Sequence, residues 1–331
     1  MSCSFTNAPA LHDHLRSLSM RAPDVHDRLA VFPLFGPPPR LEYVSFAQGR
    51  AAGVSIKELE DRASVNDLLV INPTGTAVLL YEGEEVLGAQ QNRTFDVSVL
   101  VGAGTRLHVP VSCVEAGRWD GSRHDEAFDA APQTAYPSLR RMKNTASRAS
   151  MAAGMAARAD QGAVWNELAR KSARLAVASA TGAMGDIYDD RRERLDEFRR
   201  AMVLHEGQTG ALVLVGGRPV VLDHVSRPEV FAALHGPLVQ GYALDALEAS
   251  GGPDPSDAVA EGFLSRVLGA RVSEHDGIGL GRDLRFAEGA VAGAGLLAGD
   301  ELVQLTAFPD EPAAGGEPRA RIRRPSRRRP G

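Results

Sequence analysis

The chain has few cysteines and no long hydrophobic run. Cys3 and Cys113 are its two cysteines among 331 residues, which excludes a disulfide framework and indicates a reducing compartment. No window approaches the roughly 18 consecutive apolar residues that cross a bilayer, so no membrane association is expected. Residues 1–20 lack the apolar core of a secretory signal. These absences predict a cytoplasmic protein.

Aromatic residues are scarce, and the chain has no excess of positive charge. The formal net charge is −5, which argues against a protein that seeks nucleic acid with its whole surface. The basic exception is the arginine-rich segment 319–329, for which we expect only weak contact with nucleic acid. Aromatic residues make up 5% of the chain, so Trp119 and Trp165 mark places where a large side chain has a specific use.

The hydrophobic pattern changes along the chain and predicts an α+β fold. Residues 26–125 alternate in short runs, which is typical of a mostly antiparallel sandwich or barrel-like β region. Residues 130–205 are rich in helix formers, and residues 206–310 read as a mixed α/β part packed on the rest. We therefore expect one domain over 26–310, a flexible leader over 1–25 and a disordered arginine-rich tail over 312–331.

Two glycine-containing stretches give local predictions within the last part of the chain. Gly216 and Gly217 lie between two apolar runs and predict a β-hairpin turn. The segment 227–250 reads as a helix, which we expect to be interrupted near Gly236 and Pro237.

Two polar segments stand at the ends of predicted strands. The first, "GEEVLGAQQNRTF" (residues 83–95), carries carboxylates, amides and an arginine. In the second, "VPVSCVEAGRW" (residues 109–119), one face of the strand ends in Cys113 and then Glu115. If the segments are neighbours, one rim gathers the side chains of Glu84 or Glu85, Gln91, Asn92, Arg93, Glu115, Arg118 and the indole of Trp119. Such a set suits a planar base, sugar hydroxyls or phosphates.

A structural explanation competes with this one. Glu115 is equally consistent with forming an ion pair with Arg93 or Arg118 that fixes a turn. Trp119 is consistent with filling one end of the hydrophobic core. Cys113 is the candidate nucleophile, but a core cysteine explains it as well, because His108 falls on the opposite face of a regular strand. No metal site is expected, although Mg²⁺ on Glu84, Glu85 and Glu115 stays open.

A predicted helix, "DQGAVWNEL" (residues 160–168), adds two further candidates. Gln161 and Trp165 are four residues apart and share one face of this helix. Either Trp165 packs into the core and Gln161 faces solvent, or the helix lies across the rim and adds an amide and a second indole.

The segments "LLYEGEEVLGAQQNRTFDVSVLV", "VPVSCVEAGRW" and "QGAVWNEL" together resemble the ARPP domain family. The name stands for ARG and rhodanese-phosphatase-superfamily-associated protein, and the resemblance extends from about Arg28 to Phe308. It implies a context of ADP-ribosylglycohydrolases, with ADP-ribose, NAD-derived nucleotides or sugar phosphates as ligands and an ADP-ribose-processing protein as partner. The positions that match the family are Glu85, Gly88, Gln91, Asn92, Arg93, Cys113, Glu115, Gly117, Arg118, Trp119, Gln161 and Trp165.

Two functions follow as hypotheses. The first is binding or processing of an ADP-ribose-derived or NAD-derived compound, as a ligand-binding protein or as a hydrolase or transferase. Glu85, Glu115 and Cys113 are its catalytic candidates, while Gln91, Asn92, Arg93, Arg118, Trp119, Gln161 and Trp165 are its ligand-binding candidates. The second is a non-catalytic scaffold or partner-binding module in which the polar cluster is structural. The sequence names no cofactor.

Overall fold

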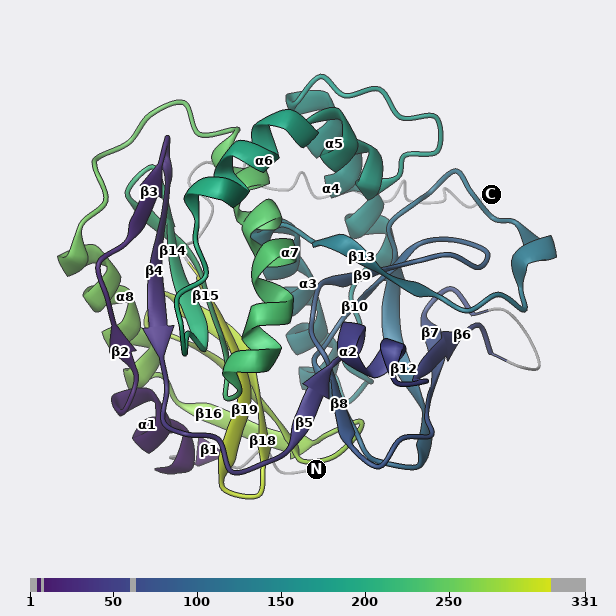
Figure 1. The fold of residues 1–331 in the computed structure, drawn as a ribbon, viewed down its shortest axis with the longest axis horizontal. Helices are drawn as coiled ribbons and strands as arrows, with labels where there is room; N and C mark the ends of the chain where they lie inside the picture. Colours follow the sequence, from purple (N-terminus) through teal and green to yellow (C-terminus); the bar gives the residue numbers. More distant parts are fainter. Residues whose placement is uncertain (1–4, 7–8, 60–63, 311–331) are drawn as a thin grey trace, which may run out of the picture.

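A ten-stranded antiparallel sheet forms one side of the molecule in the computed structural model, which describes residues 5–6, 9–59 and 64–310 (Figure 1). Nine strands follow one another across it: β1 (Phe5–Thr6), β16 (Val272–Asp276), β17 (Arg282–Glu288), β18 (Val291–Ala298), β19 (Glu301–Pro309), β15 (Arg218–Val225), β14 (Gly210–Val215), β4 (Leu29–Phe35) and β2 (Ser19–Met20). The tenth, β3 (Asp24–His26), also pairs with β4. The turn between β14 and β15 is the predicted hairpin, with Gly216 and Gly217 at φ 56° and 70°.

Two smaller sheets lie on the other side and carry both polar segments. A six-stranded sheet has the order β13 (Asp129–Thr134), β9 (Glu84–Leu87), β10 (Arg93–Phe95), β12 (Thr105–Cys113), β7 (Asp67–Asn72) and β6 (Ser55–Lys57). A three-stranded sheet consists of β11 (Val99–Val101), β8 (Ala77–Leu80) and β5 (Tyr43–Ser45), with β5 and β8 parallel. Apolar side chains from both sheets share one core, as expected for a sandwich-like β region.

Helices fill the space between the sheets and cover them. The central ones are α3 (Pro137–Ala152) and α7 (Pro228–Ala246), which stand between the large and the small sheets (Figure 1). The others are α1 (Pro9–Arg16), α2 (Phe46–Ala51), α4 (Gln161–Arg174), α5 (Met184–Asp190), α6 (Arg192–Ala201) and α8 (Asp257–Gly269). The predicted α+β class and the helical middle of the chain are thereby confirmed. No helix among the described residues is both long and apolar enough to cross a bilayer.

The structure differs from two expectations. Leu11 and Leu15 of α1 are buried in the core that α1 and α8 form against the large sheet, so this part of the expected leader packs as part of the fold. The expected break in the helix at Pro237 is also absent, because α7 runs through it. Apolar residues around most of α7 are buried, which offsets the cost of the missing N–H. The arginine-rich tail lies outside the described residues.

Candidate functional site

The two polar segments are neighbours, which is the condition that the sequence sets for a shared rim. Strand β10 pairs with β12 and places Arg93 opposite Cys113, and on its other edge it pairs with β9 and places Thr94 opposite Glu85. The polar side chains that follow these strands therefore meet at one end of the six-stranded sheet. We call Gln91, Asn92, Arg93, Glu115, Arg118 and Trp119 the rim cluster.

Arg118 uses all three of its guanidinium nitrogens within the rim cluster and its loops. Its Nε and Nη2 both lie 2.7 Å from Oε2 of Glu115. Nη1 donates to the carbonyl of Ala89 at 2.9 Å, and Nη2 also donates to Oδ1 of Asn92 at 2.8 Å. The other oxygen of Glu115 accepts from Thr181 at 3.1 Å. Arg118 and Glu115 thus pair with each other. Their bonds join three loops, which contain Ala89 and Asn92, Glu115 and Arg118, and Thr181.

Gln161 continues the ladder of the sheet with its side chain. Its Oε1 accepts from the backbone N–H of Cys113 at 2.8 Å, and its Nε2 donates to the carbonyl of the same residue at 2.9 Å. Helix α4 therefore lies against the rim, as one of the two readings expects. Trp165 on this helix is 36% exposed and is not a core residue.

Two glycines explain why the chain can bend so tightly here. A Cβ on Gly117 would lie 2.9 Å from the Thr181 backbone, to which the Gly117 N–H donates. Gly83, at φ 83°, leaves room for Arg140, whose Cδ would lie 2.8 Å from a Cβ at that position. The first polar segment thus begins against a buried arginine on α3.

Arg93 is the incompletely paired member of the rim cluster. Its side chain has no exposed surface, and Nη1 donates to the carbonyl and to Oε1 of Gln91, both at 2.9 Å. Its Nε and Nη2 have no hydrogen-bond partner among the described residues. Nη2 faces Oε1 of Glu58 at 3.5 Å, and the guanidinium carbon lies 5.6 Å from the ring centre of Trp119. A buried cation with open donor directions is costly unless something pairs with it.

Glu58 is a residue of this site that sequence reasoning missed. Both its carboxylate oxygens are buried and lack a hydrogen bond within the described part of the chain. Burial raises its pKa, and the nearby charge of Arg93 only partly opposes this shift. No spacing signal connects Glu58 to the rim, because Glu58 follows β6, and β7 and β12 lie between β6 and the strand of Arg93 in the sheet.

Glu84 and Glu85 are buried and sit apart from Arg93. Glu85 accepts from Nε2 of Gln133 at 2.7 Å, and Glu84 accepts from the backbone N–H of Tyr81, also at 2.7 Å. Burial raises the pKa of each carboxyl to about 8. Both are therefore largely protonated at neutral pH, which suits a structural hydrogen bond better than a metal ligand. No group of three or more potential ligand side chains within the described ranges is arranged to hold a metal.

Cys113 is buried, and its Sγ lies 3.5 Å from the carbonyl of Val65. Burial raises the pKa of the thiol to about 11, although Arg93 opposes this. A thiol with such a pKa holds very little thiolate at neutral pH, which counts against nucleophilic chemistry. The catalytic roles of Cys113, Glu85 and Glu115 stay predictions that this geometry does not favour.

A second polar network lies next to the first polar segment and was not predicted. Asp223 of β15 accepts from Nη1 and Nη2 of Arg140 at 2.9 and 2.6 Å. It also accepts from the hydroxyls of Tyr81 and Tyr242, each at 2.6 Å. One turn along α3, Lys143 lies 3.0 Å from Asp96. These ion pairs join the large sheet to the smaller ones through α3.

Three cavities lie away from the rim cluster. One of about 280 Å³ is found between the end of α3 and the strands β16 and β17. Two wider ones, of about 560 and 750 Å³, adjoin the outer side of α3 and share Ser138, Arg141 and Asp245 in their linings. None of the three is lined by a rim-cluster residue.

Comparison with known proteins identifies the family. No curated protein and no solved structure matches this chain. One family model does, and it matches residues 17–308, which include the rim cluster, Gln161 and both central helices. The chain belongs to the family of the ARG and Rhodanese-Phosphatase-superfamily-associated Protein domain, ARPP-1.

Proposed function

We propose that the protein binds an ADP-ribose-derived or NAD-derived nucleotide, or a sugar phosphate, at the rim cluster. The observation that carries this proposal is the buried guanidinium of Arg93, whose Nε and Nη2 lack hydrogen-bond partners in the described structure. A phosphate oxygen supplies the acceptor that these donors lack, in a charge-assisted hydrogen bond.

Trp119 provides the second element of the proposed site. Its indole lies over Arg93 and is 51% exposed, which is unusual for so large an apolar side chain. Because Arg93 has no exposed surface, the proposal requires a neighbouring group to move aside for an anion, and the indole is the exposed neighbour that can do so. The displaced indole then offers its face to a planar base. Arg118 and Glu115 have the supporting role of holding the surrounding loops in place.

Binding fits this geometry better than catalysis does. The thiol of Cys113 is protonated at neutral pH, and Glu85 is bonded to Gln133. Glu115 is held between Arg118 and Thr181, so it is not a free base. The association that the family name records, with ARG and rhodanese-phosphatase proteins, supports a ligand of the ADP-ribose class.

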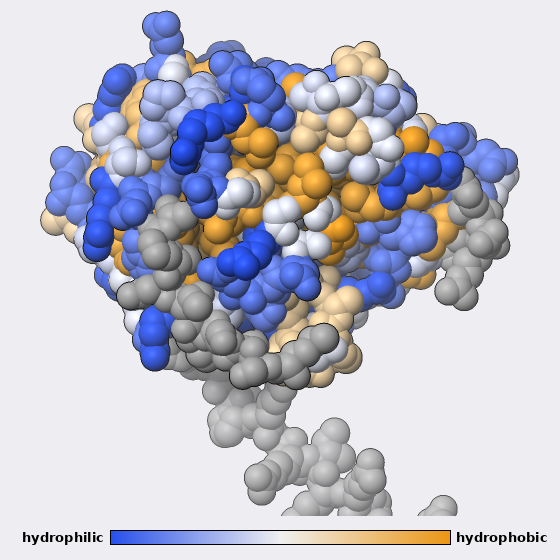
Figure 2. Space-filling view, turned by 90° about the horizontal axis from the view of Figure 1, so that it is seen from below, coloured by the Kyte–Doolittle hydropathy of each residue, from blue (hydrophilic) through white to orange (hydrophobic). Residues whose placement is uncertain are grey.

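A partner-binding module is the second candidate. The internal pairing of Arg118, Glu115 and Asn92 favours it, since these side chains leave few donors for a small ligand. Seen from below, hydrophobic surface also gathers in the middle of one face between hydrophilic margins (Figure 2). Such patches are common at protein–protein contacts.

Thermal unfolding with ADP-ribose and with NAD tests the first candidate. We expect a rise in melting temperature for the wild type, since a ligand at 100 times its Kd stabilises the folded state by about 2.7 kcal/mol. Trp119→Ala should reduce this rise, because the face that stacks on the base is lost, and should leave the melting temperature without ligand nearly unchanged, because the indole is half exposed.

Leu204→Ala is the matched control, since Leu204 is an exposed apolar residue at 44% and lies outside the rim cluster. Leu204→Ala should show the same ligand-induced rise in melting temperature as the wild type. No rise in the wild type, or an equal rise in Trp119→Ala, would contradict ligand binding at the rim. The partner-binding module is favoured if no ligand raises the melting temperature and a double-mutant cycle of Glu115→Gln and Arg118→Ala shows strong coupling in stability without ligand.

A further inference from the structure

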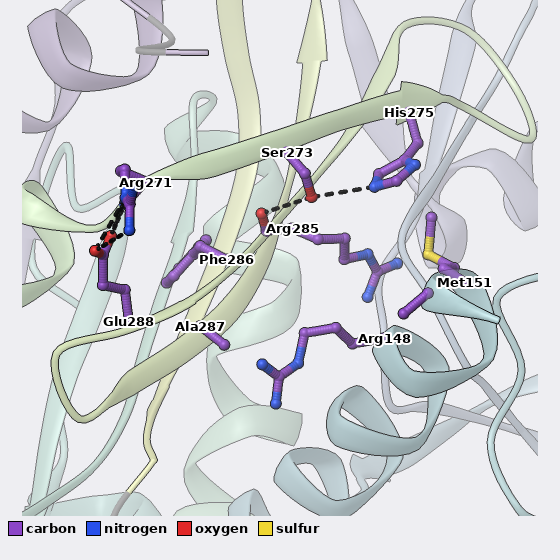
Figure 3. Close-up of a pocket in the computed structure, with 10 residues that line it drawn as sticks. Arg148, Met151, Arg271, Ser273, His275, Arg285, Phe286, Ala287 and Glu288 are labelled. Atoms are coloured by element: carbon purple, nitrogen blue, oxygen red, sulfur yellow. Dashed lines mark hydrogen bonds and ion pairs between the residues drawn. The ribbon is translucent and has the colours of Figure 1, made fainter. Parts of the chain in front are cut away.

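The smallest of the three cavities, of about 280 Å³, has the features of a second binding site, separate from the rim cluster. It opens between the last turns of α3 and the strands β16 and β17 of the large sheet (Figure 3). Its lining combines apolar side chains, among them Met151 and Phe286, with the three arginines Arg148, Arg271 and Arg285. An apolar cavity with a few converging polar groups is the usual form of a small-molecule site.

Arg285 places a buried donor in this cavity. Its side chain is 2% exposed, and Asp283 binds its Nε at 2.5 Å and its Nη2 at 2.6 Å. The third nitrogen, Nη1, is buried and has no hydrogen-bond partner in residues 5–6, 9–59 and 64–310. Because Asp283 holds the guanidinium by two bonds, the direction of the open nitrogen is fixed before any ligand arrives.

Arg148 brings a second donor from the helix. Its Nε is buried without a partner in the same described ranges, and its Nη2 is 3.8 Å from Asp310, which is too long for a hydrogen bond. Figure 3 shows the side chains of Arg148 and Arg285 reaching toward the space between α3 and β17. Two arginine side chains from different elements thus line one cavity, and each has a buried guanidinium nitrogen without a hydrogen-bond partner in the described ranges.

The other polar side chains are already paired and mark the ends of the cavity. Ser273 donates to the carbonyl of Arg285 at 3.2 Å and lies 3.1 Å from Nε2 of His275. Arg271 and Glu288 form an ion pair at 2.9 Å across the other end. Phe286 and Met151 contribute apolar surface to the same lining, and the side chains of Arg148 and Arg285 lie between the two pairs (Figure 3).

The open donors define the ligand class. Each arginine has a carboxylate nearby, so the cavity has little excess positive charge. It therefore selects a ligand mainly by the acceptor atoms that the ligand offers to the unpaired guanidinium nitrogens. A phosphate monoester has enough oxygens to accept from two guanidinium groups at once, whereas a neutral sugar does not match their charge. The volume lies just below the range of about 300–1,000 Å³ for drug-sized ligands, which fits one ring with one phosphate better than a dinucleotide.

We propose that this cavity binds a phosphorylated compound of about the size of a pentose phosphate. Its phosphate accepts from Nη1 of Arg285 and from Nε of Arg148, and its ring packs on Phe286 and Met151. This site goes beyond the function proposed for the rim cluster, because the two share no residue.

Isothermal titration with ribose 5-phosphate tests the proposal, with ribose as the unphosphorylated control. We expect saturable binding of ribose 5-phosphate and no binding of ribose. Arg148→Gln should weaken the binding by about tenfold or more, because one charge-assisted bond is lost. This variant is the informative one, since the Arg148 side chain is 31% exposed and its loss does not strand a buried carboxylate.

Two further variants make the result decisive. Arg141→Gln changes an arginine that lies on the same helix but lines only the other two cavities, and it should bind as the wild type does. Trp119→Ala separates the two sites, because it weakens any binding of ribose 5-phosphate at the rim cluster but changes no residue that lines the cavity. The proposal is overturned if the wild type does not bind, if Arg148→Gln binds like the wild type, or if Trp119→Ala alone removes binding, which would place the phosphate at the rim cluster.

Discussion

Asp223→Asn is expected to lower the free energy of unfolding by about 3–5 kcal/mol, the usual cost of breaking a buried ion pair. Burial alone would raise the pKa of Asp223, but Arg140 and the tyrosine hydroxyls outweigh it, so its pKa is lowered and the group is charged. An asparagine would keep one acceptor oxygen but would place a donor NH2 group where the other oxygen now accepts from Arg140 and a tyrosine hydroxyl. Arg140 would then keep only Glu82, at 3.3 Å, as a carboxylate partner. Urea denaturation of both proteins at neutral pH measures the difference.

Asp189→Asn is the control for this prediction. Asp189 pairs with Arg192 on the surface, where both side chains are about two-thirds exposed (66% and 69%), so its loss should change stability by less than about 0.5 kcal/mol. Adding Arg140→Met to Asp223→Asn should recover part of the loss, because the stranded charge is removed. A loss below about 1 kcal/mol for Asp223→Asn would show that this ion pair does not hold the sheets together.

Glu85→Gln is expected to make the protein more stable than the wild type at pH 9 and about equally stable at pH 5. The folded pKa of Glu85 is about 8, against about 4.5 in the unfolded chain, so the folded state binds the proton more tightly. The stabilisation that the Glu85 carboxyl contributes is therefore fully present below pH 4.5 and is lost as the pH rises to about 8. At about 1.4 kcal/mol for each unit between about 4.5 and about 8, the difference at pH 9 is on the order of 5 kcal/mol.

A pH series of denaturation curves for wild type and Glu85→Gln measures this effect. The glutamine imitates the protonated carboxyl, so the variant should lose part of the decline with pH. Glu84 keeps its own contribution in both proteins, because its pKa is also about 8. Glu193→Gln, at an exposed position of α6, is the control, and its stability should depend on pH as that of the wild type does. Parallel profiles for Glu85→Gln would mean that Glu85 is already charged at neutral pH.

The features that the sequence predicts well are local or depend on strand alternation. The hairpin at Gly216 and Gly217 needs only a turn that accepts two positive φ angles. The meeting of the two polar segments follows from short consecutive strands that pair in an antiparallel sheet. The sequence therefore indicates which residues would share a rim if the segments pair, but not which partners their side chains have.

The polar face of α3 shows why the rest could not be predicted. Arg140, Lys143, Asn144 and Ser147 repeat at helical spacing, and such a pattern normally indicates a face in water. Here this face is buried, because Asp223 and Asp96 from distant strands supply the matching charges. Glu58 was missed for the same reason, since its partner Arg93 is 35 positions away in the sequence (93 minus 58) and on another strand.

Cys113 and Trp165 show how burial decides between two readings of one residue. The sequence allows Cys113 as a nucleophile or as a core residue, and its burial with a pKa near 11 favours the core. For Trp165 the reading as a core residue is not supported, because the indole is 36% exposed on a helix whose Gln161 bonds the rim strand. Its role in binding a ligand stays a prediction.

The central claim is that a ligand displaces the indole of Trp119 and pairs with Arg93. Tryptophan fluorescence during a titration with ADP-ribose measures this most directly, in the wild type and in Trp119→Phe. We predict a saturable change in the wild type that is lost in the variant. An equal change in both proteins, or wild-type binding seen by calorimetry with no change in fluorescence, would contradict the claim.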